Sequence, residues 1–320
     1  KPGLLLDPGK RYAGEVLVRD IGIGFAAGEE ETPWYGSVEK EDLDRFLTRT
    51  PMGNKGTFGK VLVIAGCGAM CGAAVLCARA VLASGAGMVK GVTEERNRTP
   101  LFCALPEAMA DFWKEDEPLP EEALLQDLAW ADAVVAGPGL SKSRTAKELL
   151  SFTLHHTEVP LVLDADALNL IAEDAELLSG CRAEIILTPH VGELARLLHT
   201  TIAECQRDPV GSARRAAEKY QACCVRKDSI TVTAEEGREQ YYINTSGSSA
   251  LATAGSGDVL AGITGALAAK RQCGKDRNIS LAKTAALAVY AHGKAGEAAE
   301  EKSSASYVTA SEIIRGLQSI

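Results

Sequence analysis

The stretch Lys60-Val-Leu-Val-Ile-Ala65, followed by a glycine-rich turn and an alanine-rich segment from Gly72 to Ser84, decides the fold of this chain. The first run is short, apolar and bounded by glycine, which predicts a buried strand, whereas the second has helical spacing. Further strands are predicted at 88–93, 131–136, 161–164, 183–188, 223–226 and 230–233. Strands that alternate with helices indicate an α/β fold with a mostly parallel central sheet covered by helices on both faces.

The two ends of the chain differ from this middle part. Two long helices rich in small residues are predicted near 258–272 and 280–300, and Thr309-Ala-Ser-Glu312 is a capping box that opens a last short helix. Residues 1–45 predict a single strand, Gly14-Glu-Val-Leu-Val-Arg-Asp-Ile-Gly-Ile-Gly24, and a lone strand cannot form a core. We therefore predict an appendage or domain remnant at 1–45 and a main domain at 46–320. Because the chain starts with lysine, we expect it to begin inside a longer protein.

The composition excludes several classes of protein. Hydrophobic residues make up 46% and charged residues 24% of the chain, and the net charge is −9, which argues against a nucleic-acid partner. There is neither a signal peptide nor an apolar run of the ~18 residues that a membrane span needs, so we expect a cytoplasmic protein without a membrane partner. The nine cysteines lie mostly in apolar segments, which predicts buried, reduced thiols and not disulfides or a zinc site.

The segment most informative about function is Ala254-Gly-Ser-Gly-Asp-Val-Leu-Ala-Gly262. Its glycines let backbone N–H groups approach a phosphate closely, and the N-terminus of the helix behind it adds partial positive charge. Asp258 at that position can take a proton from a hydroxyl group as a general base. The alternative is a tight turn in which Asp258 merely caps the helix.

Two other glycine-rich loops follow predicted strands. Gly66-Cys-Gly-Ala-Met-Cys-Gly72 has the spacing GxGxxxG, and we find no acidic residue that ends a strand about 20 residues later, so we predict a pocket wall and not a dinucleotide fingerprint. Gly137-Pro-Gly-Leu-Ser-Lys-Ser143 lacks a glycine of the phosphate-loop motif. Gly139 can still bring its backbone close to a ligand, or the segment is a plain turn.

Polar residues follow three further strands, and ligands of open parallel sheets bind where the carboxyl ends of several strands converge. Thr188-Pro-His-Val-Gly-Glu193 offers His190 as a donor, and Glu193 either binds a metal-bound water or caps a helix. Asp164 and Asp166 are two carboxylates at another strand end. The segment 227–231 supplies a lysine, hydroxyls and free N–H groups between two strands, where it clasps a nucleotide or forms an ordinary hairpin.

Taken in order, these segments resemble the ADP-dependent NAD(P)H-hydrate dehydratase family, whose fold is similar to ribokinase. That resemblance implies a three-layer αβα sandwich over 46–320. Residues 13–23 are similar to the end of an NAD(P)H-hydrate epimerase domain, so 1–45 is expected to be the tail of such a domain plus a linker, without epimerase activity. The motifs that carry the resemblance are Asn54-Lys-Gly-Thr-Phe-Gly-Lys-Val-Leu-Val-Ile-Ala-Gly66, Ser84-Gly-Ala-Gly-Met-Val89, Ala136-Gly-Pro-Gly-Leu-Ser141, Leu163-Asp-Ala-Asp-Ala-Leu-Asn169, Thr188-Pro-His-Val-Gly-Glu193 and Ala254-Gly-Ser-Gly-Asp-Val-Leu-Ala-Gly262.

The resemblance also implies roles for individual residues. The hydrated nicotinamide nucleotide is expected to contact Ala73, Gly139, His190 and Asp258. ADP is expected to contact Lys227, Asp228, Ser229, Ile230, Thr231 and Gly257, with Mg²⁺ near Glu193 through water. A homo-oligomer, a tetramer in the family, is expected. The chain departs from the family pattern at Val191, Asp228 and Ser256, and the added negative charge of Asp228 puts the nucleotide loop most in doubt.

The mechanism that follows is a hypothesis. Asp258 deprotonates the C6 hydroxyl of the S epimer of NADH or NADPH hydrate, this oxygen attacks the β-phosphoryl group of ADP, and the phosphate is then expelled to restore the double bond, leaving AMP and phosphate. Two alternatives stay open: a ribokinase-like kinase of a small alcohol such as a hydroxymethylpyrimidine or hydroxyethylthiazole, and a non-catalytic sensor of ADP or dinucleotide. The sequence does not distinguish NADH hydrate from NADPH hydrate as the preferred substrate.

Overall fold

The computed structural model describes residues 2–6, 9–14, 16–17, 19, 35–274, 277–303 and 305–320. At the centre of the molecule is a ten-stranded sheet with the order β1-β10-β9-β8-β7-β6-β5-β2-β3-β4. The strands are β1 (Tyr35–Gly36), β2 (Lys60–Ile64), β3 (Met88–Glu94), β4 (Met109–Trp113), β5 (Ala133–Ala136), β6 (Leu161–Leu163), β7 (Ile185–Leu187), β8 (Cys223–Arg226), β9 (Thr231–Glu235) and β10 (Tyr241–Asn244).

The sheet is mostly parallel, as the alternation of strands and helices predicts. The seven strands from β8 to β4 run parallel to one another, and β9 is antiparallel to both β8 and β10. In β2, the side chains from Val61 to Ile64 are all buried, which agrees with the unbroken apolar run, because helices cover both faces of a parallel sheet.

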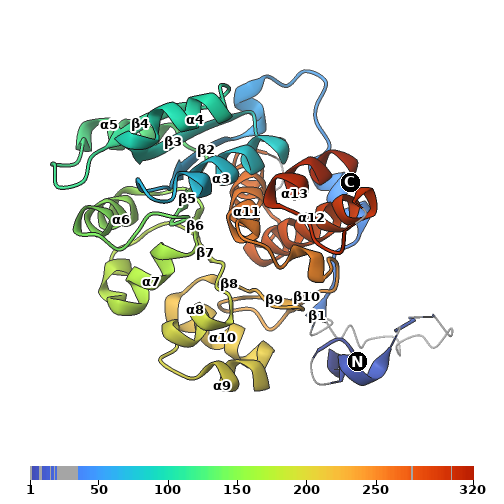
Figure 1. Ribbon diagram of the computed structural model, residues 1–320. Coiled ribbons are helices and arrows are strands. Elements are labelled where there is room, and N and C mark those ends of the chain that lie inside the picture. Colours follow the sequence, from blue (N-terminus) through green and yellow to red (C-terminus); the bar gives the residue numbers. More distant parts are fainter. Residues whose placement is uncertain are drawn as a thin grey trace.

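Thirteen α-helices are found in the described part of the chain, and they form layers on either side of the sheet (Figure 1). The helices are α1 (Lys10–Ala13), α2 (Lys40–Leu47), α3 (Cys71–Ala83), α4 (Arg98–Ala104), α5 (Glu121–Trp130), α6 (Arg144–His156), α7 (Asp166–Glu173), α8 (Val191–Leu197), α9 (Ile202–Arg207), α10 (Pro209–Tyr220), α11 (Ser256–Cys273), α12 (Leu281–Lys302) and α13 (Ala310–Gly316). Helices α3, α11, α12 and α13 share one buried apolar cluster with the sheet, and α5, α6 and α7 belong to a second cluster. Helices α8 and α10 pack on β8, β9 and β10 in a third cluster.

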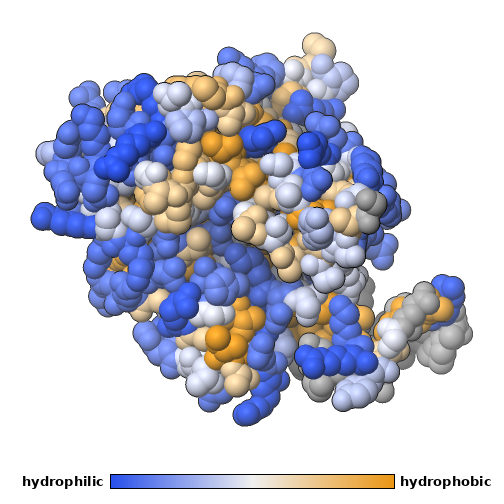
Figure 2. All heavy atoms as spheres, in the orientation of Figure 1, coloured by the Kyte–Doolittle hydropathy of each residue, from blue (hydrophilic) through white to orange (hydrophobic). Residues whose placement is uncertain are grey.

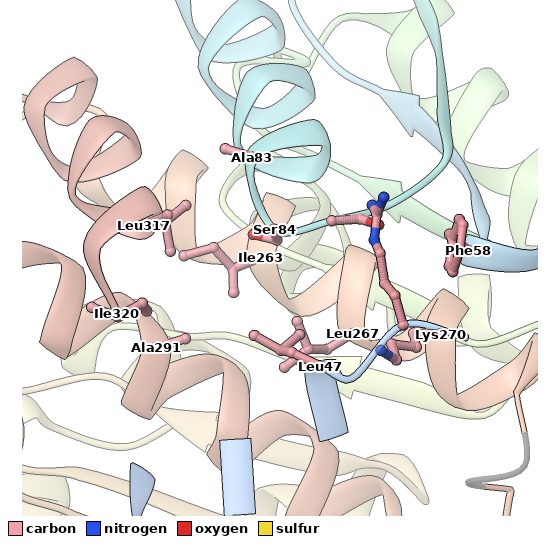
Figure 3. Close-up of a pocket in the computed structure, with 12 residues that line it drawn as sticks. Leu47, Phe58, Ala83, Ser84, Ile263, Leu267, Lys270, Ala291, Leu317 and Ile320 are labelled. Atoms are coloured by element: carbon pink, nitrogen blue, oxygen red, sulfur yellow. The ribbon is translucent and has the colours of Figure 1, made fainter. Parts of the chain in front are cut away.

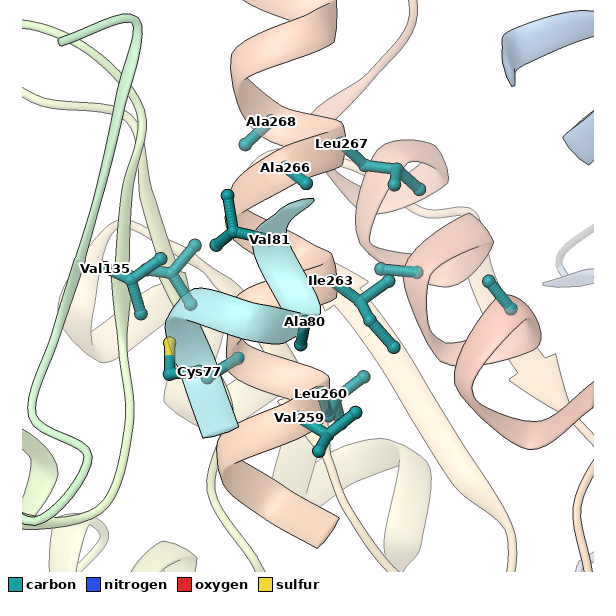
Figure 4. Close-up of a cluster of buried hydrophobic side chains, with 14 of the residues drawn as sticks. Cys77, Ala80, Val81, Val135, Val259, Leu260, Ile263, Ala266, Leu267 and Ala268 are labelled. Atoms are coloured by element: carbon teal, nitrogen blue, oxygen red, sulfur yellow. The ribbon is translucent and has the colours of Figure 1, made fainter. Parts of the chain in front are cut away.

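The close packing of α3 on α11 fixes where α11 begins at the sheet (Figure 4). Small residues make this packing possible: a Cβ atom at Gly262 would collide with the carbonyl oxygen of Cys77 in α3, and one at Gly265 would collide with Val135 on β5. The N-terminus of α11 is thereby held against the carboxyl ends of the central strands.

The surface of the molecule is hollowed near the middle of the space-filling view, and hydrophilic residues line this hollow (Figure 2).

Several sequence predictions can be compared with these elements. The predicted strands appear within a few residues of their places, and Thr309 caps α13 in the predicted capping box. Strands β1, β4 and β10 were not predicted; β1 has only two residues, and in β10 only alternate side chains are buried, so its sequence lacks a continuous apolar run. The predicted strand at Gly14–Gly24 lies mostly outside the described residues.

Candidate active site

The carboxyl ends of β6, β7 and β8 bring a buried ion pair to the edge of the sheet. Asp164, which follows β6, is almost fully buried and accepts hydrogen bonds from Thr188 Oγ1 and Lys227 Nζ, both at 2.7 Å. Lys227 follows β8, and its backbone N–H donates to the carbonyl oxygen of Pro189 after β7 at 2.8 Å. Burial lowers the pKa of Lys227, but Asp164 and Glu193 raise it more, so the lysine is charged. Its ammonium group is the fixed positive charge of the site.

Asp258 lies in the first turn of α11, beside this ion pair. Gly255 precedes the helix with a φ of +85°, a conformation that suits glycine, and it turns the chain into the helix. Burial and the nearby carboxylates of Asp164 and Asp166, opposed by the positive charge of Lys227, together raise the pKa of Asp258 to about 6. No residue in the described part of the chain donates a hydrogen bond to this carboxylate, so it is available to accept a proton from a ligand.

His190 and Glu193 form a reciprocal cap at the start of α8. The His190 backbone N–H donates to Glu193 Oε2 at 2.8 Å, and His190 Nδ1 accepts from the N–H groups of Gly192 and Glu193. Burial raises the pKa of Glu193 to about 7, whereas burial together with Lys227 and Arg196 lowers the pKa of His190. The imidazole is more than half exposed and can face a ligand. Of the two roles considered for Glu193, helix capping is therefore confirmed.

The described residues do not form a metal site by themselves. Within the described ranges, no group of three or more His, Cys, Asp or Glu side chains is arranged to hold an ion. Mg²⁺ is commonly held by one or two carboxylates together with substrate phosphates and water. Fewer than three protein ligands are enough for an ion that arrives with a nucleotide, because the phosphates and water complete its coordination.

The six residues expected to contact ADP do not all lie at one place. Five of them, 227–231, belong to the loop after β8 and the start of β9, and Gly257 lies in the first turn of α11. Lys227 faces Asp164, and a Cβ atom at Gly257 would lie 3.5 Å from its Nζ, so these two residues are neighbours. Asp228 instead pairs with the buried Arg226 at 3.0 Å. The guanidinium group of Arg226 offsets the negative charge that raised doubt about this loop.

The other members of the loop face a different side. Ser229 and Ile230 line a pocket of about 470 Å³, together with Asp228, Arg207 and Arg226. The side chain of Thr231 is buried in β9. The structure thus brings Lys227 and Gly257 to the central site and places Asp228, Ser229 and Ile230 beside the separate pocket.

Gly139 and Ala73 lie further along the same edge, after β5 and in the first turn of α3. Gly139 has a φ of +58°, and a Cβ atom there would lie 2.8 Å from the Cβ of Ala73. The carbonyl oxygen of Gly139 accepts from the Cys67 N–H at 2.7 Å, which ties the two glycine-rich loops together. These residues form a floor where a ligand can approach the backbone.

Three contributions to the site escaped the sequence reasoning. Thr188 orients Asp164, and Ser256 Oγ lies 3.1 Å from Nε2 of the buried His292, whose pKa burial lowers to about 4. Neither contact could be read from sequence, because the partners of each pair are distant in the chain. The third is a correction: we expected no acidic residue to end a strand after the first glycine-rich loop, but Glu94 is the last residue of β3.

A second hollow lies away from these groups (Figure 3). It is an apolar pocket of about 160 Å³ near the C-terminal ends of α3 and α11, lined by Leu47, Arg49, Phe58, Ala83, Ser84, Gly85, Ile263, Leu267, Lys270, Ala291, Leu317 and Ile320. No carboxylate lines it, so it holds no candidate base. The candidate active site is therefore the edge between Asp258 and Ala73.

A family model described as NAD(P)H-hydrate dehydratase matches residues 61–319, which include every strand and loop of this edge. The chain belongs to the NAD(P)H-hydrate dehydratase family. Among curated relatives, it is 36% identical to a bifunctional NAD(P)H-hydrate repair enzyme of Moorella thermoacetica, over 93% of this chain and 56% of the relative. It is 38% identical to an ADP-dependent (S)-NAD(P)H-hydrate dehydratase of Neisseria meningitidis, over 80% of this chain and 82% of that protein.

Solved structures support the same assignment and the ribokinase-like fold. A ribokinase-like superfamily protein of Enterococcus faecalis matches with a TM-score of 0.76 and 27% identity, covering 90% of this dehydratase-family chain and 95% of that one. An ADP/ATP-dependent NAD(P)H-hydrate dehydratase of Bacillus subtilis, co-crystallised with ATP and Mg²⁺, matches with a TM-score of 0.73 and 29% identity, covering 87% and 95%. The predicted α/β sandwich of the ribokinase type is confirmed.

Two further findings concern the extent of this family member. The chain spans a little more than half the length of the bifunctional relatives, 56% for that of Moorella thermoacetica and 58% for that of Escherichia coli. Among the helices of the described residues, none combines the length and the apolar character that crossing a bilayer demands.

Proposed function

We propose that this protein catalyses the ADP-dependent dehydration of the S epimer of NADH or NADPH hydrate, which restores the reduced nicotinamide nucleotide and releases AMP and phosphate. The observation that carries the proposal is the Asp258 carboxylate at the N-terminus of α11, next to the Lys227–Asp164 ion pair. A base (Asp258), a positive charge (Lys227) and the backbone N–H groups at the start of α11 therefore lie close together. Phosphoryl transfer from a nucleotide to a hydroxyl group needs these three elements.

The nucleotide and the substrate are inferred from relatives and from the site together. The relative of Neisseria meningitidis is named for ADP and for the S epimer, and the structure of the Bacillus subtilis protein was obtained with ATP and Mg²⁺. The residues at 227 and 257 are expected to hold the phosphates of ADP, because the ammonium group of Lys227 lies at the start of α11. Ala73, Gly139 and His190 are expected to hold the hydrated nicotinamide.

In the first step, Asp258 accepts the proton of the C6 hydroxyl group while that oxygen attacks the β-phosphorus of ADP. The bond from this phosphorus to the oxygen bridging to the α-phosphate breaks, and AMP leaves with the bridging oxygen. Negative charge on the transferred group is met by the N–H groups of residues 255–257 and by Lys227. Burial, which raises the pKa of Asp258 to about 6, makes it a better proton acceptor near neutral pH than an ordinary aspartate.

In the second step, the C6–O bond of the phosphorylated hydrate breaks. The lone pair of the ring nitrogen supplies the electrons, inorganic phosphate leaves, and loss of a proton from C5 places the double bond between C5 and C6. Hydroxide is a poor leaving group and phosphate is a good one, so the two-step route explains why a nucleotide is consumed. AMP, phosphate and NADH or NADPH balance the reaction.

A magnesium ion fits this site as a partner of the nucleotide. The carboxylates of Asp164, Asp258 and Glu193 would hold it through one or two oxygens or through water, with the phosphates completing its coordination. When bound, the ion supplies positive charge that stabilises the phosphoryl group in transfer.

We also propose how the chain is organised. Residues 1–45 would be the end of an N-terminal epimerase domain with its linker, and 46–320 the dehydratase domain. The alignment with the bifunctional relative supports this, because it covers 93% of this chain. A cytoplasmic location and a homo-oligomer, a tetramer by the family resemblance, are part of the same proposal.

The test is to mix the purified protein with S-NADH hydrate and Mg²⁺ and to follow absorbance at the reduced-nicotinamide band, with ADP, with ATP and without nucleotide. Recovery of the band with ADP, together with AMP and phosphate, is expected. A stable phosphorylated product with ATP would instead indicate the small-alcohol kinase. Nucleotide binding without any product would indicate the sensor and would overturn the proposal.

A further inference from the structure

Glu94, the last residue of β3, closes the first glycine-rich loop. Its buried carboxylate accepts a hydrogen bond from the N–H of Gly68 and pairs with Arg96 Nε at 3.0 Å. Glu94 thus comes from the strand that directly follows α3 and reaches back to the loop before α3. The side chain of Arg96 is 77% exposed, so it can leave Glu94 and turn to a ligand.

Side chains that follow β3 or lie within it also hold the loop that Glu94 touches. Asn97 Nδ2 donates to the carbonyl oxygen of Cys67, and Thr93 Oγ1 donates to that of Gly66, which has a φ of +78°. No side chain caps the N-terminus of α3, whose first turn contains Ala73. That turn therefore lies where the substrate is expected to contact Ala73.

Glu94 and Asp258 mark the two ends of one elongated edge. Asp164, the neighbour of Asp258, follows β6, and the order from there is β6, β5, β2, β3. Three strand spacings separate β6 from β3, which is roughly 14 Å. A nicotinamide dinucleotide has its two ribose rings joined by a pyrophosphate, so its shape matches an edge with a base at one end and an acid–arginine pair at the other.

We propose that Glu94 and Arg96 bind the 2′ position of the adenosine ribose and so determine the preference of this protein between NADPH hydrate and NADH hydrate. This inference rests on the proposed function, since it places the nicotinamide half at Asp258. The loop lacks the GxGxxG spacing of Rossmann folds, but the chemistry of the pair is the same: there, an acidic residue at the strand end after the glycine-rich loop accepts a hydrogen bond from the 2′-hydroxyl group, and a nearby arginine accommodates a 2′-phosphate.

The pair suits both substrates. With NADH hydrate, the carboxylate of Glu94 accepts a hydrogen bond from the 2′-hydroxyl group, and Arg96 keeps its contact with Glu94. With NADPH hydrate, Arg96 turns to the 2′-phosphate, which is the ligand that a guanidinium group binds with two parallel hydrogen bonds. Glu94 alone would repel that phosphate, so the discrimination depends on Arg96.

The experiment compares kcat/KM for S-NADPH hydrate and S-NADH hydrate in the wild type, Arg96→Ala and Glu94→Gln. For Arg96→Ala, kcat/KM for NADPH hydrate is expected to fall about tenfold to a hundredfold while that for NADH hydrate changes little, because a hydrogen bond to a charged group is lost. Glu94→Gln, which can still accept from Gly68, is expected to shift the ratio toward NADPH hydrate. Arg98→Ala, at an exposed arginine paired with Glu95, is the matched control and should leave the ratio unchanged.

Binding of NADPH and NADH by calorimetry, with the same variants, separates the two levels of the proposal. If the enzyme is active but Arg96→Ala changes kcat/KM equally for both substrates, or for neither, the assignment of the 2′ site is overturned and the dehydratase function is not. An inactive wild type whose binding ratio still responds to Arg96→Ala would overturn the dehydratase function and keep the dinucleotide site. Failure to bind either dinucleotide would overturn both.

Discussion

Replacing Asp258 by asparagine is expected to stop catalysis and at the same time to stabilise the fold. Asparagine has the same shape and no charge, so the substitution removes only the ionised form of the group. The pKa of Asp258 is about 6 because burial and the nearby Asp164 and Asp166 disfavour its charge, against an ordinary value of 3.8. The folded protein therefore bears a free-energy cost at neutral pH that the variant does not.

The size of that cost follows from the two pKa values. Between pH 3.8 and about 6, the folded chain binds more protons than the unfolded chain, so wild-type stability falls as the pH rises through this window. The cost reaches about 3 kcal/mol at pH 7 and is about 1.6 kcal/mol at pH 5. Loss of the attraction between the carboxylate and the α11 macrodipole offsets about 0.3 to 1 kcal/mol. We expect Asp258→Asn to be about 2 kcal/mol more stable at pH 7, with a smaller gain at pH 5.

Urea unfolding followed by circular dichroism at both pH values measures this difference, and the dehydratase assay should show a loss of at least ~10²-fold. Glu312→Gln is a control in which the change in stability should have the opposite sign. Hydrogen bonds from Thr309 lower the pKa of the Glu312 carboxylate at the start of α13, so its charged form stabilises the folded protein. This substitution should destabilise the protein at neutral pH. A variant of Asp258 that is no more stable than the wild type at pH 7, or whose gain is the same at both pH values, would refute the reasoning.

Three further outcomes are expected. The value of kcat/KM should fall below a pH of about 6, because protonated Asp258 cannot act as the base, and a pH–rate profile of the wild type checks this. Lys227→Met should lower the free energy of unfolding by about 3 to 5 kcal/mol, since it leaves the buried Asp164 unpaired, and chemical denaturation measures the loss. Gly139→Ala should lose substrate binding, because its methyl group would lie 2.8 Å from the Cβ of Ala73, and KM for the hydrate reports it.

Each of the two substitutions has a matched comparison. Lys142→Met breaks an exposed ion pair with Glu173 and should cost less than about 1 kcal/mol. Gly180→Ala has a similar φ, +79°, with nothing within 4 Å of the new atom, so it carries backbone strain without blocking a site. The pH expectation is contradicted if kcat/KM begins to fall only well below pH 5. The lysine expectation is contradicted if Lys227→Met and Lys142→Met lose equal free energy of unfolding, and the glycine expectation if KM is unchanged in Gly139→Ala.

The α/β class, the places of most strands and the ribokinase-like assignment could all be predicted from the amino-acid sequence. These are local properties: the apolar run that becomes β2 is buried on both faces, and Thr309 caps α13 with Glu312 because both partners lie within one helical turn. The order of the glycine-rich motifs along the chain indicated the family. Asp258 was predicted as the base from the glycine-rich residues beside it in the chain.

Only the tertiary structure decided the electrostatics of the site. Lys227 and Asp164 are 63 positions apart, yet their 2.7 Å contact sets the charge beside Asp258. Glu94 was overlooked although it directly follows the predicted strand 88–93, but its contact with the glycine-rich loop, at Gly68, spans 26 positions and appears only in the structure. A pKa and a hydrogen bond depend on burial and on distances between strands, and neither quantity is encoded in spacing along the chain.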